Sequence, residues 1–240
     1  MAEAVSTPSA DTPQVGLLAR LIGVVFAPRD AYAAVSARPR WLGAMTVAGI
    51  IFIAVQVIFL STEVGRNAAL EQQLGVLKAF GITVTDQMLQ QMETRQAYAP
   101  YTTAVSLVVS LPLVTAVVAG LLLAVFTAIL GGGANFKQVY AVVAHSMMIG
   151  AIQQVFSIPI MYARADMSSP TRLSVFFPML DEMGFATYLL SAIDLFYIWS
   201  LVNVSIGVAV LYKRRTGPVA AVLLGIYAVV AVIIAAVRAF

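Results

Sequence analysis

Residues 102–162 read TTAVSLVVSLPLVTAVVAGLLLAVFTAILGGGANFKQVYAVVAHSMMIGAIQQVFSIPIMY and predict a pair of membrane helices. The two apolar runs, 102–130 and 136–162, are each long enough to cross roughly 30 Å of hydrocarbon as a helix. Only the short segment GGGANFK at 131–137 joins them. The second run therefore has to return antiparallel beside the first.

Three further apolar runs lie on either side of this pair. They cover 41–61, 187–212 and 217–239, and the tight turn KRRTG joins the last two. Five spans in all are expected, with kinks at Pro112 and Pro159, because proline cannot donate a hydrogen bond within a helix.

The composition agrees with a membrane protein. The chain of 240 residues is 61% hydrophobic and only 10% charged, whereas a soluble domain is roughly 45–50% apolar and about 25% charged. We therefore expect an all-α, polytopic membrane helix bundle of about five transmembrane helices without a separate soluble domain. There is no cysteine, so disulfides, thiolate metal sites and thiol nucleophiles are excluded.

Amphipathic helical segments are expected at both membrane faces. After a disordered tail at 1–13, the segment 14–40 predicts helices that lie in the cytoplasmic interface, because its apolar run carries Arg20 and is too short to span. The insert 62–101 predicts extracytoplasmic helices, one of them capped by Thr85 or Asp86. Together with this insert, residues 41–240 are expected to form the membrane domain.

The 14 Lys and Arg residues serve as a topology signal rather than a nucleic-acid surface, because they lie between apolar spans. With the amino terminus inside, eight cations are cytoplasmic and six lie outside, and three of the eight crowd into KRRTG. We expect the amino terminus inside and the carboxy terminus outside. The two sets are Arg20, Arg29, Arg38, Arg40, Lys137, Lys213, Arg214 and Arg215 inside, and Arg66, Lys78, Arg95, Arg164, Arg172 and Arg238 outside.

Three segments in this order resemble a known family. They are APRDAYAAVSARPRW, GGGANFKQVYAVVAHSM and AIDLFYIWSLVNVSIGVAVLYKRRTG. Over roughly 15–240 the chain resembles the Yip-one (Ypt-interacting protein) domain family in its bacterial branch. The resemblance implies a five-helix bundle with a cytoplasmic amino terminus. It implies Rab-type GTPase partners for eukaryotic relatives only, since bacteria lack that trafficking system, and it implies a bacterial cytoplasmic membrane here.

Asp194 is the only acid within a predicted span. A carboxylate in hydrocarbon costs about 2.5–3.5 kcal/mol on insertion scales, so it should face the bundle and find a partner. Helical spacing places Ser191 and Tyr197 near the same face. The residue is either a structural carboxyl satisfied by a neighbour or part of an intramembrane polar site.

His145 and Ser146 lie in the third predicted span, with Gln153 two turns later. A His facing an Asp across helices makes a simple proton relay or ion site, and equally a simple interhelical hydrogen bond. The candidate intramembrane polar site therefore comprises Ser191, Asp194, Tyr197, His145, Ser146 and Gln153.

Two glycine patterns have ordinary interpretations. GGGANFK lacks the strand and the Ser or Thr after lysine that a phosphate-binding loop needs, so a tight turn is expected. Gly217, Ala221 and Gly225 recur every four residues, which permits close helix packing, either within the bundle or in a homodimer.

Enzyme signatures are absent: there is no HExxH motif, and one His excludes a multi-histidine metal site within one subunit. A Ser110–His145 pair has no glycine-framed nucleophile to support it. We expect neither cofactor nor catalysis. The favoured function is a non-catalytic membrane scaffold with lipids and membrane proteins, or a second copy, as partners. The alternative is a small transporter for lipid, proton or another small solute that uses Asp194 and His145.

Overall fold

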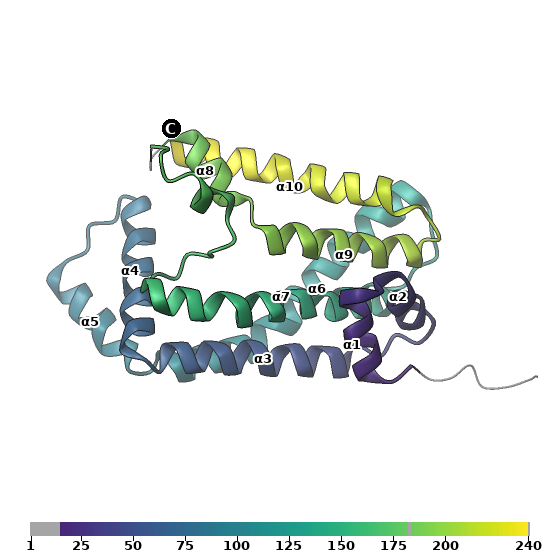
Figure 1. Ribbon diagram of the computed structural model, residues 1–240, viewed down its shortest axis with the longest axis horizontal. Coiled ribbons are helices and arrows are strands. Elements are labelled where there is room, and N and C mark those ends of the chain that lie inside the picture. Colours follow the sequence, from purple (N-terminus) through teal and green to yellow (C-terminus); the bar gives the residue numbers. More distant parts are fainter. Residues whose placement is uncertain (1–14, 182–183, 240) are drawn as a thin grey trace, which may run out of the picture.

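The computed structural model describes residues 15–181 and 184–239 and shows a polytopic membrane helix bundle (Figure 1). The long helices α3, α6, α7, α9 and α10 run along the long axis of the molecule. Their bounds are α3 Leu42–Leu60, α6 Ala99–Leu130, α7 Phe136–Arg164, α9 Leu195–Leu211 and α10 Thr216–Ala239.

Within the described residues, four helices are long and apolar enough to cross a membrane: α3, α6, α7 and α10. They match four of the predicted spans to within a few residues. The fifth, α9, is apolar but has 17 residues, which corresponds to about 26 Å at 1.5 Å per residue. A fifth crossing therefore stays a prediction.

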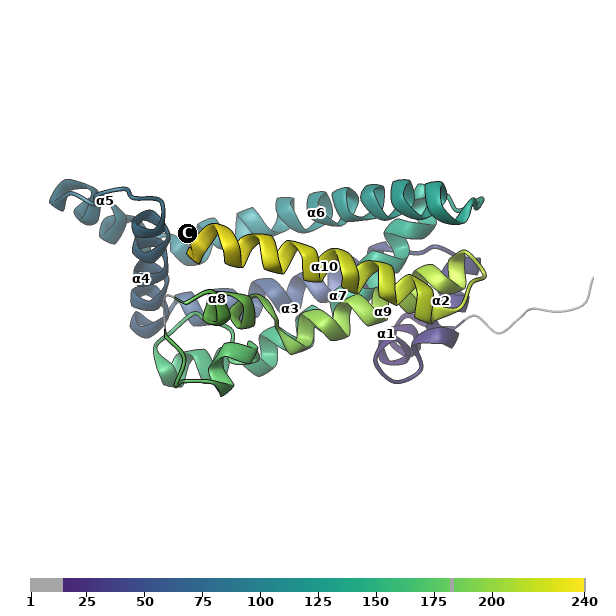
Figure 2. The same cartoon turned by 90° about the horizontal axis from the view of Figure 1, so that it is seen from above.

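Helix α7 is the centre of the bundle. Half of the residues in its most apolar 18-residue stretch are buried, against 17–22% in the corresponding stretches of α3, α6 and α10. It packs on α3, α6 and α9, while α10 packs on α9. Figure 2 shows α6 and α10 as outer helices. The largest cluster of buried side chains lies around α7 and includes Phe126, Tyr140 and Val208.

The segment 187–212 is the one predicted span whose course the structure corrects. It forms two helices, α8 (Phe185–Ala192) and α9, separated by extended backbone at Ile193, where φ is −98° and ψ is 111°. Asp194, predicted to lie within a continuous span, is therefore the N-cap of α9 and lies at a break between two helices. A short acidic side chain favours this position because it accepts hydrogen bonds from the free N–H groups of the first turn.

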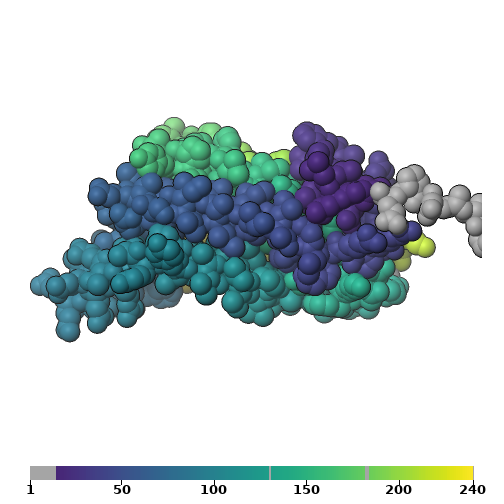
Figure 3. Space-filling model, turned by 90° about the horizontal axis from the view of Figure 1, so that it is seen from below, coloured from purple at the N-terminus to yellow at the C-terminus, as the bar shows by residue number. Residues whose placement is uncertain are grey.

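The short helices lie at opposite ends of the bundle. Helices α1 (Leu17–Phe26) and α2 (Pro28–Ala37) pack against α7, α9 and the start of α3. Figure 3 shows them in purple at one end of the bundle, beside the amino-terminal end of α3. Helix α4 (Glu63–Ala79) crosses the other end, with α5 (Asp86–Gln96) beyond it. A 3-10 turn, η1 (Leu173–Phe176), completes the elements. The predicted tail 1–13 lies outside the described residues.

Local signals account for the helix starts. Thr62 accepts from the Gly65 N–H at 3.0 Å and Thr85 from the Met88 N–H at 3.3 Å, which confirms Thr85 as the cap of α5. Asn135 and Gln138 form a reciprocal capping box at the start of α7. The turn before it is confirmed: Gly131 has φ +59°, and a β-carbon at Gly132 would lie 2.5 Å from Tyr212 Cδ1.

Candidate functional site

The carboxylate of Asp194 collects hydrogen bonds from three separate parts of the chain. Its Oδ1 accepts from the N–H groups of Phe196 and Tyr197 at 2.9 and 3.4 Å, and from Gln153 Nε2 on α7 at 3.2 Å. Its Oδ2 accepts from Ser169 Oγ at 2.5 Å and Thr171 Oγ1 at 2.9 Å. All five partners donate, which suits a carboxylate, since an ionised carboxylate only accepts.

The backbone on either side of Asp194 is held by the loop that follows α7. Arg172 and Asp194 form an isolated antiparallel bridge, in which the Leu173 N–H donates to Ile193 O at 2.9 Å and the Leu195 N–H to Thr171 O at 3.2 Å. These bonds pair backbone groups that no helix satisfies at the break.

Helix α10 contributes a further partner at the same point. Tyr227 donates its hydroxyl proton to Ala192 O and accepts the Asp194 N–H at 3.4 Å. Its ring stacks on Tyr197, with centroids 6.3 Å apart. The α8–α9 break is thus a junction of α7, its following loop and α10.

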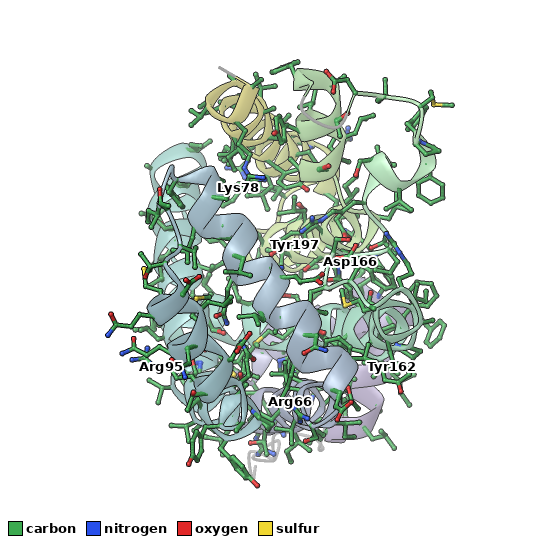
Figure 4. All side chains as sticks on the ribbon, turned by 90° about the vertical axis from the view of Figure 1, so that its left-hand side faces the viewer. Arg66, Lys78, Arg95, Tyr162, Asp166 and Tyr197 are labelled. Carbon is green, nitrogen blue, oxygen red and sulfur yellow. The ribbon has the colours of Figure 1, made fainter. Side chains whose placement is uncertain are left out.

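A second carboxylate, Asp166, organises the loop itself. It accepts the Ser168 N–H at 2.8 Å and the Ser168 hydroxyl, and it pairs with Arg164 at 3.4 Å. Partial burial raises the pKa of Asp166, but the Ser168 donors and the positive charges of Arg164 and Arg172 outweigh burial and lower it. Figure 4 views this end of the molecule, with Arg66 and Lys78 toward opposite ends of α4.

A separate buried polar cluster lies near the other end of the bundle. Tyr32 on α2 donates its hydroxyl proton to Asn203 Oδ1 on α9, and Asn203 Nδ2 donates to Val24 O on α1 at 2.7 Å. Ser146 on α7 lies beside the same tyrosine hydroxyl, and its own hydroxyl donates to Val143 O at 2.8 Å. Burial raises the pKa of the fully buried Tyr32, so it stays a neutral donor that ties α2 to the bundle.

His145 belongs to this end of the molecule and does not contact Asp194. It is fully buried, its Nδ1 lies 2.7 Å from Ala141 O, and its Nε2 has no hydrogen-bond partner among the described residues. Gln153, which does contact Asp194, is eight residues later on α7, or about 12 Å along the helix.

The structure therefore divides the six predicted site residues. Asp194 and Gln153 meet directly, and Tyr197 joins them through its backbone N–H. Ser146 contacts the Tyr32 cluster, His145 bonds within its own helix, and Ser191 is half-buried on α8. Among the described residues, no group of three His, Cys, Asp or Glu side chains is placed to hold a metal ion.

Sequence reasoning missed the partners that satisfy Asp194 and Asn203. Ser169 and Thr171 lie in the polar segment after α7, and SSPT is typical of a turn whose hydroxyls bond nearby groups. No spacing in the sequence relates them to a carboxylate 25 residues later. The sequence predicts only that Tyr32 belongs to the interfacial segment 14–40, and the docking of α2 on α9 brings it to Asn203.

The small-residue stripe on α10 faces away from the bundle. Gly217, Ala221 and Gly225 are all exposed. A β-carbon at Gly217 or Gly225 would meet no atom within 4 Å. The stripe is therefore not used for close packing within the described part of the chain.

The comparisons with known proteins give one family. The family model for the Yip1 domain matches residues 22–237, nearly the whole chain. No curated protein matches, and no solved structure matches.

Proposed function

This chain belongs to the Yip1 domain family, and from that premise we propose that it is a non-catalytic scaffold that organises a bacterial cytoplasmic membrane through contacts with other membrane proteins or a second copy of itself. Its amino terminus is inside and its carboxy terminus outside. The polar groups of the bundle support a structural role, because the carboxylate of Asp194 is fully occupied by five donors.

The observation that carries the proposal is the outward-facing stripe of Gly217, Ala221 and Gly225 on the outer helix α10. Small residues four apart let two helix backbones approach closely, so that van der Waals contacts and weak hydrogen bonds replace lipid contacts. Lipid tails fill the space along the small-residue stripe less completely than a matching helix does.

Disulfide crosslinking tests the proposal directly, because the natural chain has no cysteine. In native-lipid particles, the Ala221→Cys variant should form a crosslinked product under mild oxidation, either a dimer or an adduct with a partner protein. The matched control is Val109→Cys on α6, whose side chain is also exposed, at 64%. It should crosslink much less.

A second pair of variants separates contact from folding. Gly217→Ile and Gly225→Ile fill the stripe at positions where an added β-carbon meets no atom of the described residues within 4 Å. We expect normal folding and a loss of the crosslink at position 221. A strictly monomeric, partnerless protein, or a crosslink indifferent to both changes, would contradict the scaffold proposal.

A further inference from the structure

A groove with three cations lies at the end of the bundle that carries α1 and α2. It is bounded by α1, the first residues of α3 and the first turn of α7, and its volume is about 430 Å³. Arg20, Arg40 and Lys137 line it together with the apolar side chains of Leu17, Trp41 and Leu42. The three cations are far apart in the sequence and meet because α1 docks beside both the start of α3 and α7.

Arg20 is unusual among these cations because it is buried. Only 8% of its surface is exposed, and its Nε has no hydrogen-bond partner in the described part of the chain. Buried arginines are normally paired, since desolvating a guanidinium without a partner is costly. The groove is thus lined by a buried arginine whose Nε donor the described residues do not satisfy.

The surrounding charge has the same sign. Burial lowers the pKa of Arg20, and the positive charge of Arg40 lowers it further. Arg40 and Lys137 are exposed. The single ion pair among described residues joins Arg164 to Asp166. No carboxylate in residues 15–181 or 184–239 therefore pairs with the three cations, and an anion in the groove would relieve their repulsion.

The position of the groove at the expected headgroup level points to a lipid as the source of that anion. Trp41 is the N-cap of α3 and packs edge-to-face on Tyr140, with centroids 5.0 Å apart. Aromatic rings at span ends sit at the headgroup level. Leu42, the next residue, is 64% exposed. A ligand here meets cations on one side and apolar side chains on the other.

We propose that this groove binds an anionic glycerophospholipid, with its phosphate held by Arg20, Arg40 and Lys137 and its acyl chains against Leu17 and Leu42. One guanidinium group can donate two parallel hydrogen bonds to two oxygens of a phosphate, and lysine adds a positive point charge. Basic pockets between helices on the cytoplasmic side suit such headgroups. The lipid site does not depend on the scaffold proposal, because it lies at α1, α3 and α7 and not on α10.

Lipid binding by the purified full chain tests the site. Native mass spectrometry or fluorescence titration should show tighter binding of phosphatidylglycerol than of phosphatidylcholine. Arg40→Gln with Lys137→Gln should weaken phosphatidylglycerol binding at least about tenfold, equivalent to about 1.4 kcal/mol, and Arg20→Gln should do the same. The Arg40 and Lys137 side chains are exposed, so that double variant keeps the test valid if Arg20→Gln fails to fold.

The matched control is Arg29→Gln with Arg38→Gln. These exposed arginines lie at the same end and carry the same charge, but neither lines the groove. The control variant should bind phosphatidylglycerol like the natural chain. Equal losses in control and groove variants would overturn the site in favour of a diffuse electrostatic effect.

Competition with inorganic phosphate distinguishes a phospholipid from free phosphate as the anion bound in the groove. Millimolar phosphate should compete weakly with phosphatidylglycerol, because it makes no contact with Leu17 or Leu42. Full competition, together with no preference for phosphatidylglycerol over phosphatidylcholine, would identify a free-phosphate site and overturn the lipid proposal. Unchanged lipid binding in the groove variants would also overturn it.

Discussion

At the scale of single residues, Asp194 shows how one side chain fixes several segments at once. Its two oxygens accept from α7, from the loop after α7 and from the first turn of α9. The amino end of α9 also presents a partial positive charge, which favours a carboxylate there. Removing it would leave buried donors from three segments without an acceptor.

Asp194→Ala should therefore lower the free energy of unfolding by at least about 2 kcal/mol, from the lost cap and the unpaired buried hydroxyls. Asp194→Asn should cost less, because its amide oxygen still accepts from the α9 N–H groups. Denaturant titration in detergent micelles measures both. Glu71→Ala, an exposed carboxylate on α4, is the control, and equal effects at the two positions would contradict this role for Asp194.

Asp166 should give the protein an acid-sensitive contribution to stability. Its pKa is lowered in the folded protein, so its contribution is present at neutral pH and is lost as the pH falls through the folded pKa, below about pH 4. The effect is small because the side chain is 47% exposed and screened by water. Asp166→Asn should flatten the fall in unfolding midpoint between about pH 5 and pH 2.

Ser168→Ala is the companion variant for this measurement. It keeps the carboxylate and removes the hydroxyl that donates to it, so it should flatten the same limb in part. If the unfolding midpoint fell as steeply at low pH in Asp166→Asn as in the natural chain, other carboxyl groups would be its cause.

At the scale of helices, hydropathy predicted α3, α6, α7 and α10 well because lipid demands long, unbroken apolar runs. It did not predict the α8–α9 break. The run around Ile193 and Asp194 is apolar on both sides, and the break depends on hydrogen bonds with Thr171 and Tyr227, which are distant in the sequence. The contact between Asp194 and Gln153, and the separation of His145 from it, likewise follow from helix docking.

Helices pack closely where Gly207 of α9 faces α7 and α2. A β-carbon there would overlap Val142 Cγ1 and lie 3.1 Å from Tyr32 Cδ1. Gly207→Ala should therefore lower stability by about 1–3 kcal/mol through overpacking. Gly120→Ala on α6, where nothing lies within 4 Å, should be neutral or stabilising by up to about 1 kcal/mol. Thermal unfolding of the two variants compares them, and a neutral Gly207→Ala would contradict this packing.

At the scale of the whole molecule, α1 and α2 lie at one end of the bundle, and α4, α5 and the carboxy-terminal end of α10 lie at the other (Figures 1 and 2). The charge count predicts which end is cytoplasmic, because Lys and Arg near spans are retained inside. The orientation therefore remains a prediction that the arrangement of helices makes simple to test.

Single-cysteine labelling with a membrane-impermeant maleimide measures the orientation. Gln91→Cys on α5 should react in intact cells, and Arg29→Cys on α2 should react only after permeabilisation; both side chains are exposed. The natural chain, which lacks cysteine, is the blank. The opposite pattern of labelling would reverse the assignment.

The two tight turns, 131–135 and 212–215, bear on how the chain enters the bilayer. Each joins helices that pack on one another, α6 with α7 and α9 with α10, so each pair can insert as a hairpin whose backbone groups are already bonded. The connection from α3 to α6 and the loop after α7 are different, because they carry charges such as Glu63, Arg66, Asp166 and Arg172 and in the predicted orientation must be translocated. Biogenesis is therefore expected to depend on translocation machinery at these two connections far more than at the tight turns.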